Sequence, residues 1–130
     1  MILPEWQGVE AELTANLAHE FSNLLREVRK RHVGKGPEQV TTRFVGPWAV
    51  CELRGNLTIV EKFISRSPEG KRMIKDTRTT FIKELYQDAN LRAEFENLVG
   101  AKMITLYVDF DVDTDIGMTV YVFDRILGSE

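Results

Sequence analysis

The sequence predicts an α+β fold in which a four-stranded, mainly antiparallel sheet carries packed helices. Two pairs of β-rich segments, 39–45 with 48–54 and 102–112 with 118–123, are each joined by a short turn-forming stretch, which is typical of hairpins. Elsewhere apolar residues recur every three or four positions, which predicts amphipathic helices. The expected order is α-β-β-α-α-β-β, and strands in adjacent pairs argue against a Rossmann-type sheet.

Length and composition limit the class of protein. The 130 residues suit a single domain, 1–130, whose core we expect at about 9–125. A net charge of −3 argues against a nucleic-acid-binding protein. The sequence shows neither a signal peptide nor an apolar run of the ~20 residues that span a bilayer. We therefore expect a cytoplasmic protein that is not inserted into the membrane.

A helix is expected from about Val9 to Arg31. Basic residues crowd its last turn, which suits the negative end of a helix dipole, and Gly34, Gly36 and Pro37 then end it. Residues spaced three and four apart form the apolar stripe expected to face the core: Leu13, Leu17, Phe21, Leu24 and Val28.

The first hairpin and the helix after it have clear local signals. Gly46-Pro47 marks the turn between the first two strands. The only cysteine, Cys51, lies mid-strand among apolar residues, which predicts a buried, inert thiol. Thr58 and Glu61 have the spacing of a capping box, and a short helix is expected from there to about Arg66.

A second long helical region follows. Ser67 is expected to be its N-cap with Pro68 at the first position, and the pattern continues to about Val99, with Gly100 as C-cap. Unbroken, it would be about 45 Å long, so we expect a break near 88–90. The buried stripe is expected to consist of Ile74, Phe81, Leu85, Leu91, Phe95 and Leu98.

The last hairpin has strict alternation, which assigns its residues to two faces. One face is expected to hold Ile104, Leu106, Val108, Phe110 and Val112, and the other Met103, Thr105, Tyr107, Asp109 and Asp111. One layer of helices covers only one face, so the surplus apolar surface predicts a homodimer or higher homo-oligomer through a sheet face or the long helix. The candidate interface residues are Met103, Tyr107 and Tyr121. The alternative is a monomer whose first helix covers the second face.

Two charged stretches are candidate ligand sites. The loop with Arg31, Gly34, Lys35 and Gly36 could hold an anion. Its place at a helix C-terminus, where the dipole repels anions, favours the simpler interpretation of a helix stop.

Asp109, Asp113 and Asp115 could bind a hard cation. Counting from Asp109, the sixth and twelfth positions hold Thr114 and Val120, so an EF-hand loop is excluded. The simpler interpretation is a solvated acidic turn. The sequence contains no HExxH, GxSxG, CxxC or GxGxxG motif, so we assign no catalytic residue, metal or cofactor and expect a protein that is not an enzyme.

Three stretches together resemble the MpsC family of bacterial proteins, over roughly 13–124. They are Gly34-Lys35-Gly36-Pro37, Gly55-Asn56-Leu57-Thr58-Ile59-Val60-Glu61-Lys62 and Asp109-Phe110-Asp111-Val112-Asp113-Thr114-Asp115-Ile116. Asp111 and Thr114 stand where the family often has His and Pro.

The resemblance implies a small soluble protein encoded beside membrane proteins of a cation-translocating or bicarbonate-uptake system that generates membrane potential. It therefore implies an accessory or regulatory protein that acts through protein–protein contacts with such a membrane complex. The alternative is a small domain that binds a ligand, an anion or a cation through the basic loop or the acidic turn.

Overall fold

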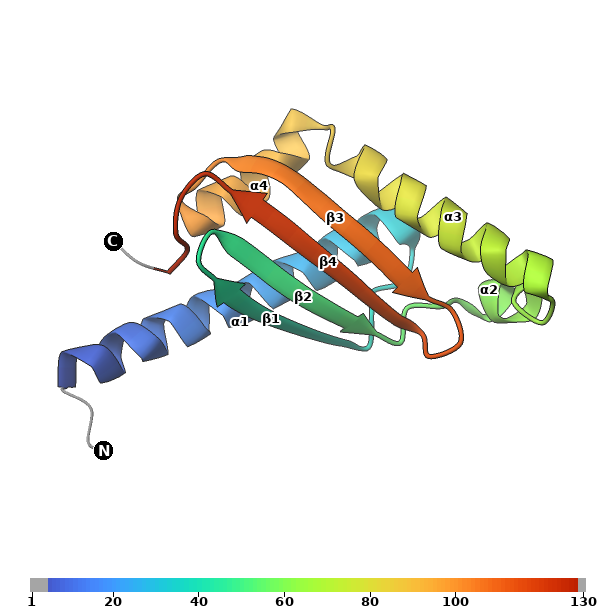
Figure 1. Ribbon diagram of the computed structural model, residues 1–130, viewed down its shortest axis with the longest axis horizontal. Coiled ribbons are helices and arrows are strands. Elements are labelled where there is room, and N and C mark those ends of the chain that lie inside the picture. The colour runs from blue at the N-terminus through green and yellow to red at the C-terminus, as the bar shows by residue number, and fades with distance from the viewer. Residues whose placement is uncertain (1–4, 129–130) are drawn as a thin grey trace.

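The computed structural model describes residues 5–128 and confirms the α+β fold. The eight elements, in chain order, are α1 (Glu5–Val33), β1 (Gln39–Val45), β2 (Trp48–Arg54), α2 (Ile59–Ile64), α3 (Pro68–Leu85), α4 (Ala89–Val99), β3 (Met103–Asp111) and β4 (Ile116–Phe123) (Figure 1).

The four strands form one sheet in the order β1-β2-β4-β3, and every neighbouring pair is antiparallel. The chain forms two hairpins, β1–β2 and β3–β4, and these pair with each other through β2 and β4 at the centre of the sheet. Consequently β1 and β3 are the two edges, and the chain's last strand lies inside the sheet. Gly46, with a φ of 58°, starts the tight turn between β1 and β2, a conformation that glycine adopts without steric cost.

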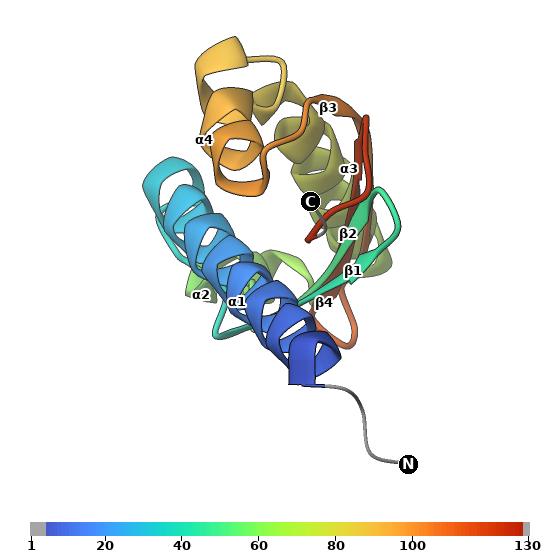
Figure 2. The ribbon, with the colours of Figure 1, turned by 90° about the vertical axis from the view of Figure 1, so that its left-hand side faces the viewer.

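The helices lie on one side of the sheet, which Figure 2 shows for α1 and α4. The core between the layers is built on aromatic rings. Tyr121 of β4 is fully buried, stacks on Phe95 and packs edge-on against Phe21. Its hydroxyl lies 2.7 Å from that of Tyr86, so two buried polar groups satisfy each other.

The first helix is longer than the sequence predicts, and its apolar stripe is only partly correct. Phe21 and Val28 are buried as expected, together with Leu25. Leu13 is 62 % exposed, so its assignment to the core was wrong. The N-terminal turns of α1 extend beyond the end of the sheet (Figure 1), and little of the domain reaches that part of the helix.

The helix caps follow the sequence closely. Thr58 accepts from the N–H of Glu61, and the Glu61 carboxylate accepts from the N–H of Thr58, so the capping box is complete. Ser67 caps α3, and the expected break falls between Leu85 and Ala89. Gly100 ends α4 in the left-handed conformation.

The core stripe of α3 differs by one position from the prediction. Phe81 is exposed, whereas Ile74, Arg78 and Ile82 face inward. These inward residues follow the spacing of four that a straight helix keeps on one face.

A β-bulge corrects the assignment of faces in β3. The pairing with β4 shifts between Met103 and Thr105, so Ile104 is an extra residue in the strand. Thr105 and the residues after it keep the predicted alternation, but Met103 turns inward and is buried. The expectation that Met103 shares a face with Tyr107 was therefore wrong. Tyr121 is also buried, because its register places it on the inner face of β4.

Candidate functional site

The side of the sheet that faces away from the helices forms a broad surface, which we call the outer face. Pairing between the strands arranges its side chains in rows across the sheet. The rows are Val45-Trp48-Val122-Thr105, Arg43-Val50-Val120-Tyr107, Thr41-Glu52-Met118-Asp109 and Gln39-Arg54-Ile116-Asp111. Val45, Trp48, Tyr107 and Met118 are exposed, with Tyr107 at 65 %. The two rows that contain Trp48 and Tyr107 are therefore largely apolar and aromatic.

Charge on the outer face is divided between the two edges. The edge strand β1 contributes Arg43, and the opposite edge strand β3 contributes Asp109 and Asp111. Between them, Glu52 and Arg54 of β2 pair with each other at 2.6 Å. The outer face therefore has a basic edge, an acidic edge, and a middle that is apolar in the rows of Trp48 and Val50 and contains the Glu52–Arg54 pair in the other two rows.

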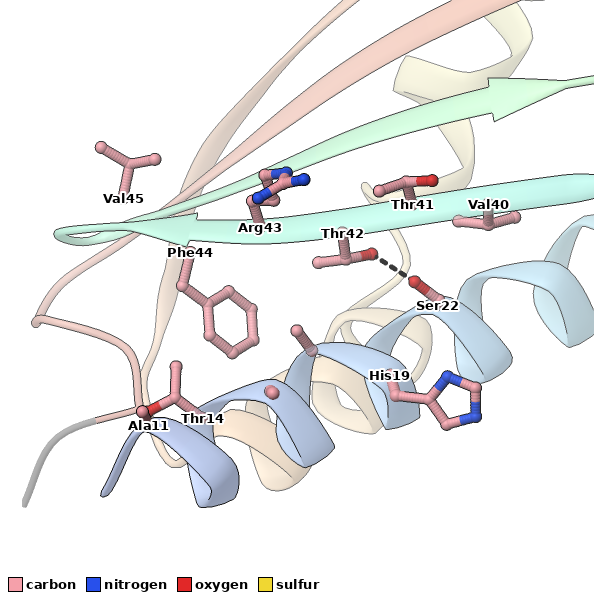
Figure 3. A pocket seen from close by; sticks show the side chains of 12 residues that line it. Ala11, Thr14, His19, Ser22, Val40, Thr41, Thr42, Arg43, Phe44 and Val45 are labelled. Carbon is pink, nitrogen blue, oxygen red and sulfur yellow. Dashed lines mark hydrogen bonds between the residues drawn. The ribbon is translucent and has the colours of Figure 1, made fainter. Parts of the chain in front are cut away.

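A groove of about 680 Å³ runs between α1 and the edge strand β1. Figure 3 shows Phe44 and Thr42 pointing from β1 toward α1, where the Thr42 and Ser22 hydroxyls lie 2.7 Å apart. His19 and Arg43 are the titratable residues of its lining. The groove is open and lined largely by small and hydroxyl side chains, so it offers room beside the strand edge.

The three stretches that carry the family resemblance meet at one point, which we call the motif cluster: Lys35, Asn56, Glu61, Arg78 and Asp115. Arg78 donates to both carboxylate oxygens of Glu61, at 2.6 and 2.7 Å, and to the main-chain oxygen of Asn56. Burial alone would raise the pKa of Glu61, but hydrogen bonds from Arg78 and Thr58 and the charge of Arg78 outweigh it and lower the pKa.

Of the two basic side chains in the predicted anion loop, Lys35 belongs to the motif cluster and Arg31 does not. Lys35 donates to the main-chain oxygens of Gly55 and Leu57, at 2.8 and 3.3 Å. Arg31 points elsewhere and pairs with Glu94 and Glu27.

The two glycines of the loop have backbone roles. Gly34 follows α1 with a φ of 92°. Gly36 lies so close to α1 that a Cβ there would be 3.1 Å from the Arg26 oxygen. The four candidate residues of the loop thus lie near one another without converging on a common point.

The acidic residues are likewise separated. Asp109 pairs with Lys75 at 3.4 Å and Asp113 with Lys71 at 2.7 Å, both on the surface. Asp115 turns inward and accepts from the N–H groups of Asn56 and Leu57. Among the described residues, no three His, Cys, Asp or Glu side chains gather in a way that could hold a metal ion.

A second polar group lies within the core and was missed by the sequence analysis. Arg29 of α1 is 6 % exposed, next to Tyr86, Tyr121 and Cys51. Cys51 is buried, as predicted, and burial raises the pKa of its thiol to about 12, which disfavours the reactive thiolate. Arg29 belongs to the run of basic residues that ends α1. It follows the buried Leu25 by four residues, so helical spacing places it on the buried side of α1, away from its exposed neighbours.

The long helices are not of the kind that crosses a bilayer. Within residues 5–128, no helix combines the length and apolar character that a span requires.

Comparison with known proteins identifies the family. A family model described as "Na+-translocating membrane potential-generating system (MpsC)" matches residues 14–125. "Uncharacterized protein YrhF" of Bacillus subtilis (strain 168) is 43% identical over 107 residues, which cover 82% of this chain and 87% of YrhF. No solved structure matches. On the match over residues 14–125, the chain belongs to the MpsC family.

Proposed function

We propose that this protein is a non-enzymatic accessory component of a Na⁺-translocating system that generates membrane potential, and that it acts on the cytoplasmic side as a homodimer. The family description supports the association with such a system. One observation carries the mode of action: the outer face has an apolar patch with exposed Trp48 and Tyr107, while the helices lie on the other side of the sheet. Exposed apolar patches of this kind mark protein contacts.

A second copy of the chain fits the outer face by charge. Two sheets pack face to face about 10 Å apart with their strands roughly aligned. A twofold axis parallel to the strands, passing between β2 and β4, places β1 of one copy over β3 of its partner. Each basic edge then meets an acidic edge, and the middle strands β2 and β4 of one copy meet those of the other.

A twofold axis parallel to the strands keeps each row of one copy opposite the same row of its partner, so the facing residues can be named. Arg43 and Tyr107 belong to the same row, and Asp109 lies in the next row along β3. In the proposed dimer Arg43 lies over the ring of the partner's Tyr107 and beside the partner's Asp109. Cation–π and ionic contacts of this kind suit arginine. The same contact forms twice because the interface is symmetric.

The proposed function predicts a defect in membrane potential. Sodium-dependent membrane potential is measured with a voltage-sensitive dye in host cells that lack the protein and are complemented with variants. Wild type is expected to restore the potential, and Tyr107→Glu is expected to fail, because it buries a charge in the dimer interface. The matched control is Met73→Glu, which changes an exposed apolar residue of α3.

Each outcome decides the proposal. Restoration by Met73→Glu but not by Tyr107→Glu supports action through the outer face. Equal restoration by both variants, at equal protein levels, excludes the outer face as the functional surface. A deletion strain with unchanged membrane potential excludes the accessory role itself.

The alternative, a ligand-binding or cation-binding domain, keeps the basic loop and the acidic turn as its sites. A cation at the acidic turn would have to compete with the lysines that pair with Asp109 and Asp113. An anion at the basic loop would have to compete with the hydrogen bond from Lys35 to a main-chain oxygen. No contact described above favours it over the outer face.

A further inference from the structure

Arg29 is a buried cation that lacks an anionic partner within the described chain. Its side chain extends from α1 into the core, and the Nε atom has no hydrogen-bond partner there. No carboxylate of residues 11–128 forms an ion pair with it. Arginine stays protonated in proteins, and burying an unpaired charge is strongly unfavourable.

Arg29 is also one of the residues that line a small cavity. It measures about 10 Å³ and is lined from several elements, with Arg29, Asn56, Arg78 and Thr119 as its main polar members. A cavity of this size is near the lower limit for one water molecule. A halide ion is larger than water and fits only if the lining side chains move apart slightly, whereas sulfate, phosphate or a small organic acid needs far more room.

The charges around the cavity leave one positive charge uncompensated. Arg78 lines the cavity, but Glu61 neutralises it at 2.6 Å. Asp109 lies at the rim, largely exposed, and Lys75 neutralises it in turn. Arg29 therefore supplies the net charge of the site.

We propose that this cavity binds one monatomic anion of chloride size, which is the counterion of Arg29. A water molecule could accept the Nε–H bond but carries no negative charge to offset that of the guanidinium. A halide satisfies both the hydrogen bond and the charge, and its contact with a guanidinium in a low-dielectric interior is stronger than in water. The site couples the stability of the core to chloride, independently of the dimer proposed above.

Thermal unfolding in matched salts tests the site. Wild-type protein is melted in sodium chloride, sodium bromide and sodium gluconate at equal ionic strength. Chloride and bromide are expected to raise the melting temperature by about 5 °C for each tenfold increase above the dissociation constant. Gluconate, which is too large for the cavity, is expected to have no such effect. Identical melting curves in chloride and gluconate would overturn the proposal and leave a water molecule in the cavity.

A variant and its control localise the effect. Arg29→Met keeps the length of the apolar stem and removes the charge, so the difference between chloride and gluconate is expected to disappear. Arg31→Met, which changes an exposed arginine of the same helix, is expected to keep it. A chloride effect that survives in Arg29→Met places the anion elsewhere and contradicts the proposal.

Anomalous scattering from crystals grown in bromide does not depend on the variant being folded. A bromide peak beside the Arg29 guanidinium is the expected result. Density for a water molecule there, with no anomalous signal, is the result that overturns the proposal.

Discussion

The carboxylate of Asp115 accepts a hydrogen bond from the main-chain N–H of Asn56 at 2.9 Å and from that of Leu57 at 3.2 Å. It does so from a left-handed backbone conformation, with a φ of 53°, which Asp tolerates better than most residues. The turn between β3 and β4 is thereby tied to the segment that leads into α2. Lys35 reaches the same segment from the end of α1, so three distant parts of the chain are joined at one point.

Removing this link is expected to destabilise the fold. Asp115→Ala leaves the partly buried N–H groups of Asn56 and Leu57 without their acceptor, which costs about 2 kcal/mol of unfolding free energy. The matched control is Asp113→Ala, which removes a surface ion pair with Lys71 and is expected to cost less than about 1 kcal/mol. Urea unfolding followed by circular dichroism measures both. Equal costs for the two variants would show that Asp115 is as dispensable as the surface pair.

The contact between Arg78 and Glu61 is expected to be the strongest polar interaction of the motif cluster. Arg78→Met removes both guanidinium hydrogen bonds to the Glu61 carboxylate, which keeps only the Thr58 N–H, and the one to the Asn56 oxygen, at a cost of about 3 kcal/mol. A double-mutant cycle with Glu61→Gln separates the pair from its surroundings. A coupling energy near zero would mean that the two side chains contribute independently.

Acid is expected to weaken the fold through Glu61. Its pKa is lower in the folded than in the unfolded protein, so the unfolded state binds more protons. The stabilisation from this difference is complete above the unfolded pKa and is lost as the pH falls through the folded pKa. Unfolding free energy measured between pH 7 and the acid range is therefore expected to fall less steeply in Glu61→Gln than in wild type. Parallel pH profiles for the two proteins would assign the acid sensitivity to other carboxylates.

The sequence predicted local structure well because local signals were unambiguous. The capping box at Thr58 and the left-handed Gly100 are fixed by neighbours along the chain, and the structure confirms both. The position of Met103 could not be predicted, because the bulge at Ile104 depends on the pairing with β4.

The buried arginines were missed for a related reason. A run of basic residues at a helix end is usually solvent-exposed, so Arg29 did not stand out from its neighbours in the sequence. Arg78 lies in a helix stripe where the apolar pattern favoured Phe81. Its partners, Glu61 and the Asn56 oxygen, come from another part of the chain. Only the tertiary structure brings these groups together, so sequence periodicity contained no sign of the pair.

The acidic turn is expected to bind divalent cations weakly at most. Lys71 and Lys75 form surface ion pairs with Asp113 and Asp109, and Asp115 is engaged with main-chain N–H groups. Calorimetric titration with calcium and magnesium is therefore expected to show no micromolar binding. Micromolar affinity that disappears in Asp113→Asn but persists in Asp76→Asn, an exposed α3 carboxylate, would instead support the alternative cation-binding function.

The central claim is that two copies pack through their outer faces with basic edge on acidic edge. Light scattering coupled to gel filtration at micromolar concentration tests it most directly. Wild type is expected to have about twice the 14.9 kDa mass of the chain. Arg43→Glu and Asp109→Lys each place like charges together across the proposed interface, so each is expected to shift the protein toward the monomer.

The double variant, Arg43→Glu with Asp109→Lys, exchanges the two edges and is expected to restore the dimer. Circular dichroism of each variant confirms that the fold is retained. A dimer that is lost in both single variants and recovered in the double variant is the result the account predicts. A wild-type protein that elutes as a 14.9 kDa species, or a dimer that neither single variant weakens, would contradict it.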